Sequence, residues 1–457
     1  MTSKLINLIS VFATSVVFLL SITAIAKAQP HPVPFVDELN HTGVASCATA
    51  GCHGDQVTGD GAGPVVGQNE YFQWRSNTEK GAHSRAYEVL LTPHAKRIAN
   101  NLGVGPAEQA AECLDCHADN VHAAKRSQRF QISDGVGCEA CHGGAQNWLA
   151  FHRIGAGHEK NIEAGLYPTE DPVARARLCF GCHLGSSYEN QFVNHRIMGA
   201  GHPRLKFELD LYTTIQKHHR VDADYRDRKT VAPGTQVWAV GQAMALERTL
   251  ELLIDNNTGR AGAFPELVFF DCHACHQPIS NGTNDLDWRP NPGRSLGPGA
   301  PILNDANLIM LVAAMRVIDP ALATQLENEG RVLHAASQHS GSQFRTAAEA
   351  LRITAAASAE RIMNTDLSNP ALVKSVLREI VSADTSRLYT NYAAAEQALF
   401  AVQRLSAALD MTDSAITSRI ENASNAAQGP YAFQYGAFRS ALFDISAQIE
   451  QYNWNMR

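Results

Sequence analysis

The spacing of its cysteines constrains this chain most strongly, because all ten fall into five pairs and a histidine directly follows each pair. Four segments have the spacing C-x-x-C-H, whereas the first has the wider spacing C-x-x-x-x-C-H. Each pair must form a tight local turn that presents two thiols and one imidazole together. The pairs are Cys47 and Cys52, Cys113 and Cys116, Cys138 and Cys141, Cys179 and Cys182, and Cys272 and Cys275.

The spacing C-x-x-C-H is the attachment sequence of c-type haem. Its two thiols bond to neighbouring vinyl groups of one porphyrin, and the adjacent imidazole reaches the iron from the same side. The sequence therefore predicts five covalently bound haem c groups, the first of them held by the wider loop. The expected iron ligands within the motifs are His53, His117, His142, His183 and His276.

Zinc binding and disulfide formation are the alternative roles for paired cysteines. A structural zinc site combines two pairs into four ligands and needs no histidine after each pair, and five pairs cannot all combine two by two. Disulfides form in exported proteins, but bridges across two or four residues would be strained and would join no distant segments. The pattern therefore favours haem over both.

The N-terminus has the pattern of a secretory signal peptide. Lys4 precedes an apolar run from Leu5 to Ala26, and a small-x-small cleavage site ends at Ala28. Cleavage after Ala28 would release an exported, periplasmic protein without a membrane span. The alternative is an uncleaved anchor, because the run is long enough to cross a bilayer.

The charge of the chain argues against nucleic acid as a partner. The formal net charge is −7, and removal of residues 1–28, which carry two lysines and no acid, makes it more negative. Proteins bind nucleic acid through clustered Lys and Arg. We expect redox partner proteins instead, and a basic patch on such a partner would complement an acidic surface.

The motifs and the breaker residues predict the domain organisation. We expect a signal peptide at 1–28, a five-haem cytochrome c domain at 29–280, a Pro/Gly-rich linker at 281–302 and a helical domain at 303–457. The fold class is mainly α, with short helices and loops around stacked haems followed by a C-terminal helical bundle. Apolar spacing predicts helices at 236–256, 304–318, 320–337, 343–363, 370–382, 386–409 and 431–452.

Several segments between the motifs resemble the cytochrome c-554 family. These segments are Tyr71–Trp74 with Gly81–Tyr87, Gly135–Gly143, Phe151–Arg153 and Ile197–Leu205. The resemblance covers about residues 44–205 and continues more weakly to 280. It implies a multihaem electron-transfer protein with closely stacked haem pairs, most of them with two histidine ligands and one lacking a sixth ligand. The type member of the family receives electrons from hydroxylamine oxidoreductase.

This chain departs from the family pattern in three ways. Its first motif has two additional residues, it contains a fifth motif at Cys272–His276, and it carries a long C-terminal helical part. These differences leave the partner open, but they do not affect the general role.

Histidines outside the motifs are the candidates for the second iron ligand. The resemblance and their position favour His83 and His152, and His202 and His195 follow on position alone. Other histidines are weaker candidates, and the tandem His218-His219 is expected at a solvated helix end. The weaker candidates are His31, His41, His94, His122, His158 and His273, with Met198 and Met244 as core residues.

Three functions are consistent with these features. We expect a periplasmic electron carrier in which two histidines close each iron to substrates. The alternative is a multihaem oxidoreductase with one open haem iron that acts on a small nitrogen or sulfur compound. A third hypothesis is a scaffold or sensor whose C-terminal helices bind a partner. The sequence contains 19 histidines, which is enough to supply two ligands to each of five irons.

Overall fold

The computed structural model is mainly helical, as predicted. It contains α-helices, short 3-10 helices and two isolated β-bridges, without a named strand in its described part. The expected signal peptide at 1–28 and most of the predicted linker at 281–302 lie outside the described residues. The described residues are 32–55, 68–188, 190–260, 265–276, 293–294, 296–297, 300–339 and 341–452.

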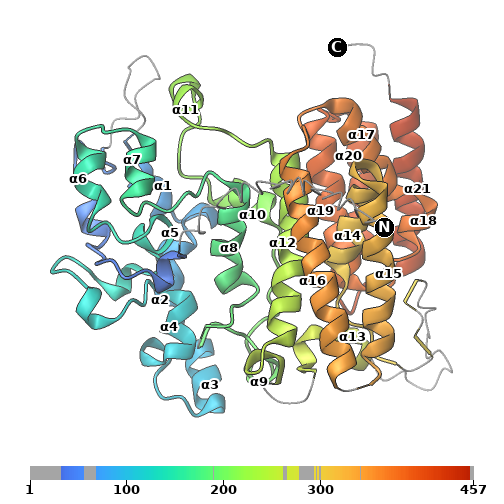
Figure 1. Ribbon diagram of the computed structural model, residues 1–457, viewed down its shortest axis with the longest axis horizontal. Coiled ribbons are helices and arrows are strands. Elements are labelled where there is room, and N and C mark those ends of the chain that lie inside the picture. The colour runs from blue at the N-terminus through green and yellow to red at the C-terminus, as the bar shows by residue number, and fades with distance from the viewer. Residues whose placement is uncertain are drawn as a thin grey trace, which may run out of the picture.

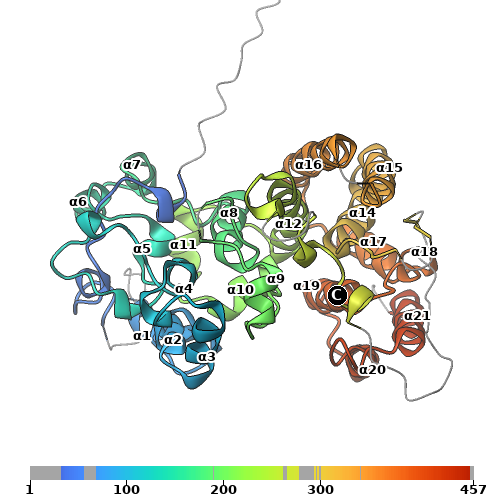
Figure 2. The same cartoon turned by 90° about the horizontal axis from the view of Figure 1, so that it is seen from below.

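Short helices and loops form the first part of the chain, on one side of the molecule in Figures 1 and 2. Local signals delimit α3, where the Thr92 side chain accepts a hydrogen bond from the Ala95 amide and Gly103 ends the helix in the left-handed conformation. The α-helices of this part are α1 (Glu70–Trp74), α2 (Ala86–Leu90), α3 (Pro93–Leu102), α4 (Ala111–His117), α5 (Glu139–His142), α6 (Trp148–Arg153) and α7 (His158–Glu163). Its 3-10 helices are η1 (Pro34–Val36), η2 (Val44–Ser46), η3 (Glu79–Gly81), η4 (His83–Arg85), η5 (Ala107–Gln109), η6 (Ala123–Lys125) and η7 (Ile132–Asp134).

In a middle group of helices, α8, α9, α10 and α12 lie between the short helices and the C-terminal bundle (Figure 2). It includes the longest helix before the bundle, α12, and the short helix α13 that carries the last cysteine pair. The group consists of α8 (Pro172–His183), α9 (His195–Gly199), α10 (Leu209–Gln216), α11 (Ala223–Arg228), α12 (Gly234–Ile254), η8 (Thr258–Arg260), η9 (Leu267–Phe269) and α13 (Cys272–Cys275).

Long helices pack side by side in the C-terminal bundle (Figure 1). Capping residues start several of them: Asp319 and Asn369 each accept an amide hydrogen bond directly before a proline at the first helical position. The helices are α14 (Ala306–Ile318), α15 (Pro320–Ala336), α16 (Ser342–Met363), α17 (Pro370–Val381), α18 (Ala383–Ser386), α19 (Tyr392–Ala408), α20 (Ser414–Ala426) and α21 (Tyr435–Gln451).

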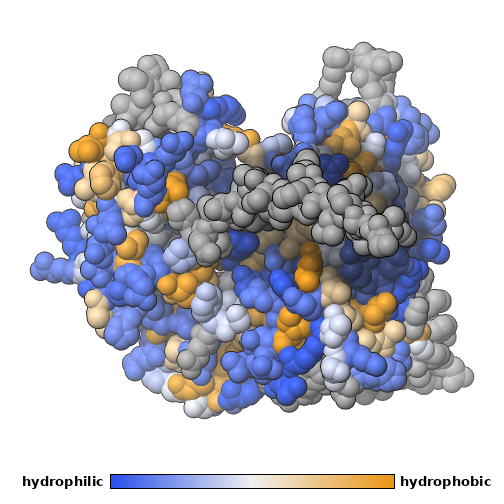
Figure 3. Space-filling view, viewed as in Figure 1, coloured by the Kyte–Doolittle hydropathy of each residue, from blue (hydrophilic) through white to orange (hydrophobic). Residues whose placement is uncertain are grey.

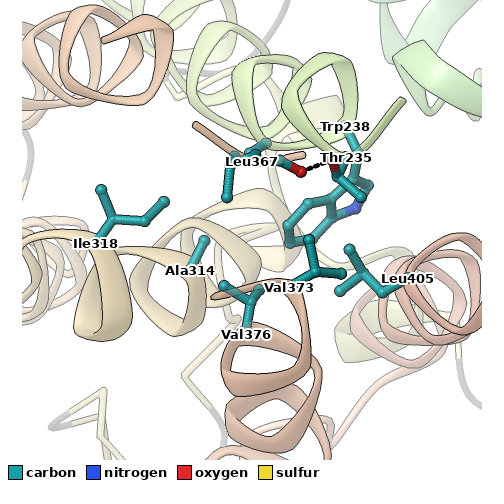
Figure 4. A pocket seen from close by; sticks show the side chains of 9 residues that line it. Thr235, Trp238, Ala314, Ile318, Leu367, Val373, Val376 and Leu405 are labelled. Carbon is teal, nitrogen blue, oxygen red and sulfur yellow. Dashed lines mark hydrogen bonds between the residues drawn. The ribbon is translucent and has the colours of Figure 1, made fainter. Parts of the chain in front are cut away.

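Helix α12 belongs to the core of the bundle, although the sequence prediction assigned it to the haem domain. It packs against α8 and α10 as well as α14, α16 and α19. Figure 4 shows Trp238 of α12 among side chains of α14, α17 and α19, with the Thr235 hydroxyl donating to the Leu367 carbonyl. One core cluster runs from Ala176 to Ile449. Described residues before and after residue 280 therefore share one core, and the domain boundaries stay a prediction.

Most of the surface seen in Figure 3 is hydrophilic, and its hydrophobic residues are scattered singly or in small groups. In the part of the chain that the structure describes, we find no helix with the length and apolar character needed to cross a membrane.

Candidate functional site

The cysteine–histidine motifs adopt a helical turn in four of five cases. Helices α4, α5 and α8 end at the motif histidine, and α13 ends one residue before His276. Positions i, i+3 and i+4 of a helix share one face, so the two thiols and the imidazole of C-x-x-C-H lie on the same side. The first motif, Cys47–His53, instead follows η2 through a series of turns, which accommodates its two additional residues.

Each motif histidine faces a second histidine from another part of the chain. A metal held by two imidazoles lies about 2 Å from each nitrogen, which places the ring centres roughly 6 Å apart. The residues therefore fit an iron with histidine on both sides at every motif. The ring-centre distances are 5.9 Å for His53 and His152, 6.4 Å for His117 and His202, 6.1 Å for His183 and His83, 6.0 Å for His276 and His195, and 5.7 Å for His142 and His219.

Hydrogen bonds at Nδ1 orient several of these rings. His117 Nδ1 donates to the Ala86 carbonyl at 3.0 Å, and His202 Nδ1 donates to the Pro203 carbonyl at 2.8 Å. His53 Nδ1 donates to the Glu70 carboxylate at 3.0 Å. An occupied Nδ1 leaves Nε2 as the nitrogen that can bind a metal.

The structure brings together all four histidines that the sequence favoured as second ligands, each opposite a different motif histidine. They come from distant elements: His83 begins η4, His152 lies on α6, His195 begins α9, and His202 follows α9. The fifth motif histidine, His142, faces the tandem pair described next.

The position of His218 and His219 differs from the prediction. The two residues follow α10 and are only partly exposed. One ring nitrogen of each lies within 4.8 Å of a ring nitrogen of His142. The pair does lie just beyond the end of α10, but the expectation of a solvated end was wrong, because both side chains are partly buried and grouped with His142. A comparison of the number of motif histidines with the number of favoured partners could have found this pair, because four partners leave one of the five motif histidines without a second ligand.

Several of the other described histidines contact groups other than a motif imidazole. His94 Nε2 is 3.1 Å from the Gly201 carbonyl, and His158 pairs with Glu170. His273 packs edge-on against Tyr431 of the C-terminal part.

Burial lowers the pKa of several of these imidazoles and so favours their neutral form, which is the form that binds a metal. It lowers the pKa of His183 to about 3 and that of His142 well below the usual value. His53 shows the opposite shift, because its hydrogen bond with Glu70 raises its pKa. Burial opposes ionisation of Glu70, but contacts with His219 and His53 outweigh it and lower the Glu70 pKa to about 2.

The thiols of different motifs lie close together. None of the ten cysteines forms a disulfide, and the Cys47 and Cys138 thiols lie close enough for each to shift the pKa of the other. The Cys182 thiol likewise lies close to the Cys116 thiol, which raises its pKa. The attachment residues of the first and third motifs are therefore neighbours, and so are those of the second and fourth motifs.

Helical turns that present two thiols and an imidazole, each opposite a second imidazole, are features of a c-type cytochrome. Residues 46–143 match the family model described as cytochrome c554 and c-prime, which confirms the predicted resemblance. This segment contains the first three motifs and His83, whereas the last two motifs lie outside it. The match supports covalently bound haem c and electron transfer as the general role. No curated protein and no solved structure matches the chain.

Proposed function

We propose that the protein is a periplasmic electron carrier that binds five haem c groups, each with two histidine ligands. The observation that carries this proposal is the second imidazole opposite every motif histidine, at ring-centre distances of 5.7 to 6.4 Å. When bound, haem supplies a one-electron couple, and two histidine ligands close its iron to substrates. An enzyme with an open iron would need a motif histidine without a facing partner.

Contacts between motifs support a continuous path for electrons. The first and third motifs meet at Cys47 and Cys138. The Cys141 thiol of the third motif is buried near Cys179 of the fourth, and burial together with Cys179 raises the pKa of Cys141 to about 12. The fourth motif meets the second at Cys182. We therefore propose a spatial order of first, third, fourth and second site.

Helix α9 links the second site to the fifth. His195 at its start faces His276, whereas His202, just beyond its end, faces His117. A path of this order ends at α13, beside the C-terminal bundle. The path runs between redox partner proteins that bind at its two ends.

Rapid-mixing reduction of the full-length protein tests the proposed path. With a small excess of a one-electron reductant, absorbance in the haem bands should rise in one phase, because electrons redistribute among the sites faster than they arrive. Separate slow phases, each with a fraction of the total amplitude, would contradict a connected path.

A further inference from the structure

Glu70 is a buried carboxylate placed between histidines of two different sites. It is the first residue of α1, and 6% of its surface is exposed. Its Oε2 accepts a hydrogen bond from His53 Nδ1 at 3.0 Å, and its Oε1 lies 3.8 Å from His219 Nδ1. His53 belongs to the first site and His219 faces His142 of the third site. One side chain therefore contacts the iron-ligand candidates of two sites.

No lysine or arginine in the described part of the chain forms an ion pair with Glu70, so the two histidines are its ion-pair partners. A buried carboxylate is stable only when charged or hydrogen-bonding groups compensate its desolvation. The two imidazoles provide that compensation. Glu70 is therefore a buried group that depends on both histidines, unlike a carboxylate in a solvent-exposed ion pair.

We propose that Glu70 is a shared positioning residue that fixes the rings of His53 and His219 and lowers the reduction potentials of the first and third haems together. An imidazole that donates Nδ1–H to a carboxylate, as His53 does, is held in the Nε2-binding tautomer and becomes a more basic ligand. The charge of Glu70 acts on His219 through space, at 3.8 Å from its Nδ1. A more basic ligand stabilises the oxidised iron, and hydrogen bonding outside the ligand set tunes haem potentials. This inference rests on the proposed haem ligation.

The same contact distinguishes between the two histidines that face His142. His219 is the nearer ring, at 5.7 Å against 6.3 Å for His218. His218 Nδ1 donates to the neutral Gln216 carbonyl at 3.2 Å, whereas His219 Nδ1 lies 3.8 Å from the Glu70 carboxylate. The proposed ligand of the third haem is therefore His219, which is the nearer ring and the one that Glu70 contacts, and His218 lies beside it.

The test is the substitution Glu70→Gln in the full-length holoprotein, which keeps the shape of the side chain and removes its charge. Spectroelectrochemical titration should show that two of the five reduction potentials rise by about 59 mV each. For a one-electron couple, this shift corresponds to a change of about tenfold in the reduction equilibrium constant. The low-spin electron paramagnetic resonance signals of two haems should shift as well. Glu70→Asp keeps the charge at a shorter reach, so both potentials should rise by less.

Glu79→Gln is the matched control, because Glu79 is an exposed carboxylate on η3. Its removal changes the net charge equally without touching an imidazole, so all five potentials should stay in place. A shift of one potential, or an equal shift of all five in both variants, would overturn the shared role of Glu70. If the wild-type protein itself contains a high-spin haem, the proposed ligation fails instead, and the two failures are distinguishable.

Discussion

At the scale of single residues, His41 shows how a buried charge joins two segments of the chain. Its Nδ1 is 2.8 Å from an Asp119 carboxylate oxygen, its Nε2 is 3.7 Å from Asp37, and its side chain is fully buried. Burial opposes protonation, but the two carboxylates outweigh it and raise the His41 pKa to about 10. The histidine therefore holds residues before the first motif against the loop that follows the second.

Replacement of His41 should destabilise the protein in a pH-dependent way. His41→Asn leaves two carboxylates without their counter-charge, and we expect a loss of about 3 to 5 kcal/mol in unfolding free energy near neutral pH. A raised folded-state pKa stabilises fully below the ordinary value of 6.5, and this contribution is lost as pH rises through about 10. Chemical denaturation from pH 6 to 10.5 measures both effects. The exposed His122→Asn is the control, and a difference that does not shrink with rising pH would contradict the assignment.

The facing histidines predict the effect of removing one of them. His202→Ala should leave the iron of the second site with one histidine, so a high-spin signal should appear for one haem and that haem should bind carbon monoxide. His94→Ala is the control, because His94 contacts the adjacent Gly201 carbonyl without facing a motif histidine. An unchanged, fully low-spin spectrum of His202→Ala would show that His202 is not a ligand.

At the scale of secondary-structure elements, α12 shows how closely the middle helices and the bundle are joined. Trp238 is 1% exposed, and Gly241 allows Leu209 of α10 to approach to 2.7 Å from where a β-carbon would stand. The side chains of α12 are buried along most of its length by helices from both sides. The fourth cysteine–histidine motif, on α8, is thus anchored to the bundle through this helix.

Truncation of Trp238 tests this anchoring role. Trp238→Ala should lower the unfolding free energy by about 3 to 5 kcal/mol, because it removes a large buried side chain and leaves a cavity. Val332→Ala on α15 is the control, because its side chain is 58% exposed and the change should cost less than about 0.5 kcal/mol. Denaturation followed by circular dichroism measures both. Equal stability of the two variants would show that α12 is not a structural link.

The sequence predicts those features that depend on local spacing. Each cysteine pair and its histidine lie within seven consecutive residues, and in four motifs within one helical turn, so the attachment residues could be read directly. Apolar spacing and first-turn prolines likewise predicted α15 and α17, whereas α20 was missed because its buried positions are few and mostly alanine.

Long-range features were harder to predict. The pairing of His219 with His142 depends on how the chain turns after α10, and the packing of α12 depends on helices that follow it by many residues. Neither leaves a periodic signal in the sequence.

At the scale of the whole molecule, the proposed path crosses from the short helices to the bundle. The first site lies near α1 and α6, at the edge farthest from the bundle, whereas α13 of the fifth site lies at the bundle (Figures 1 and 2). His276 itself is exposed. A donor and an acceptor could therefore bind at opposite ends without competing for one surface.

The most direct test of the account is the electron paramagnetic resonance spectrum of the purified, oxidised protein, recorded together with a haem count from pyridine haemochrome and mass spectrometry. The account predicts five haems per chain, all low-spin, and a spectrum that nitrite, nitric oxide and hydroxylamine leave unchanged. Fewer than five haems, or a high-spin signal that shifts when one of these ligands is added, would contradict it and favour an oxidoreductase with an open iron.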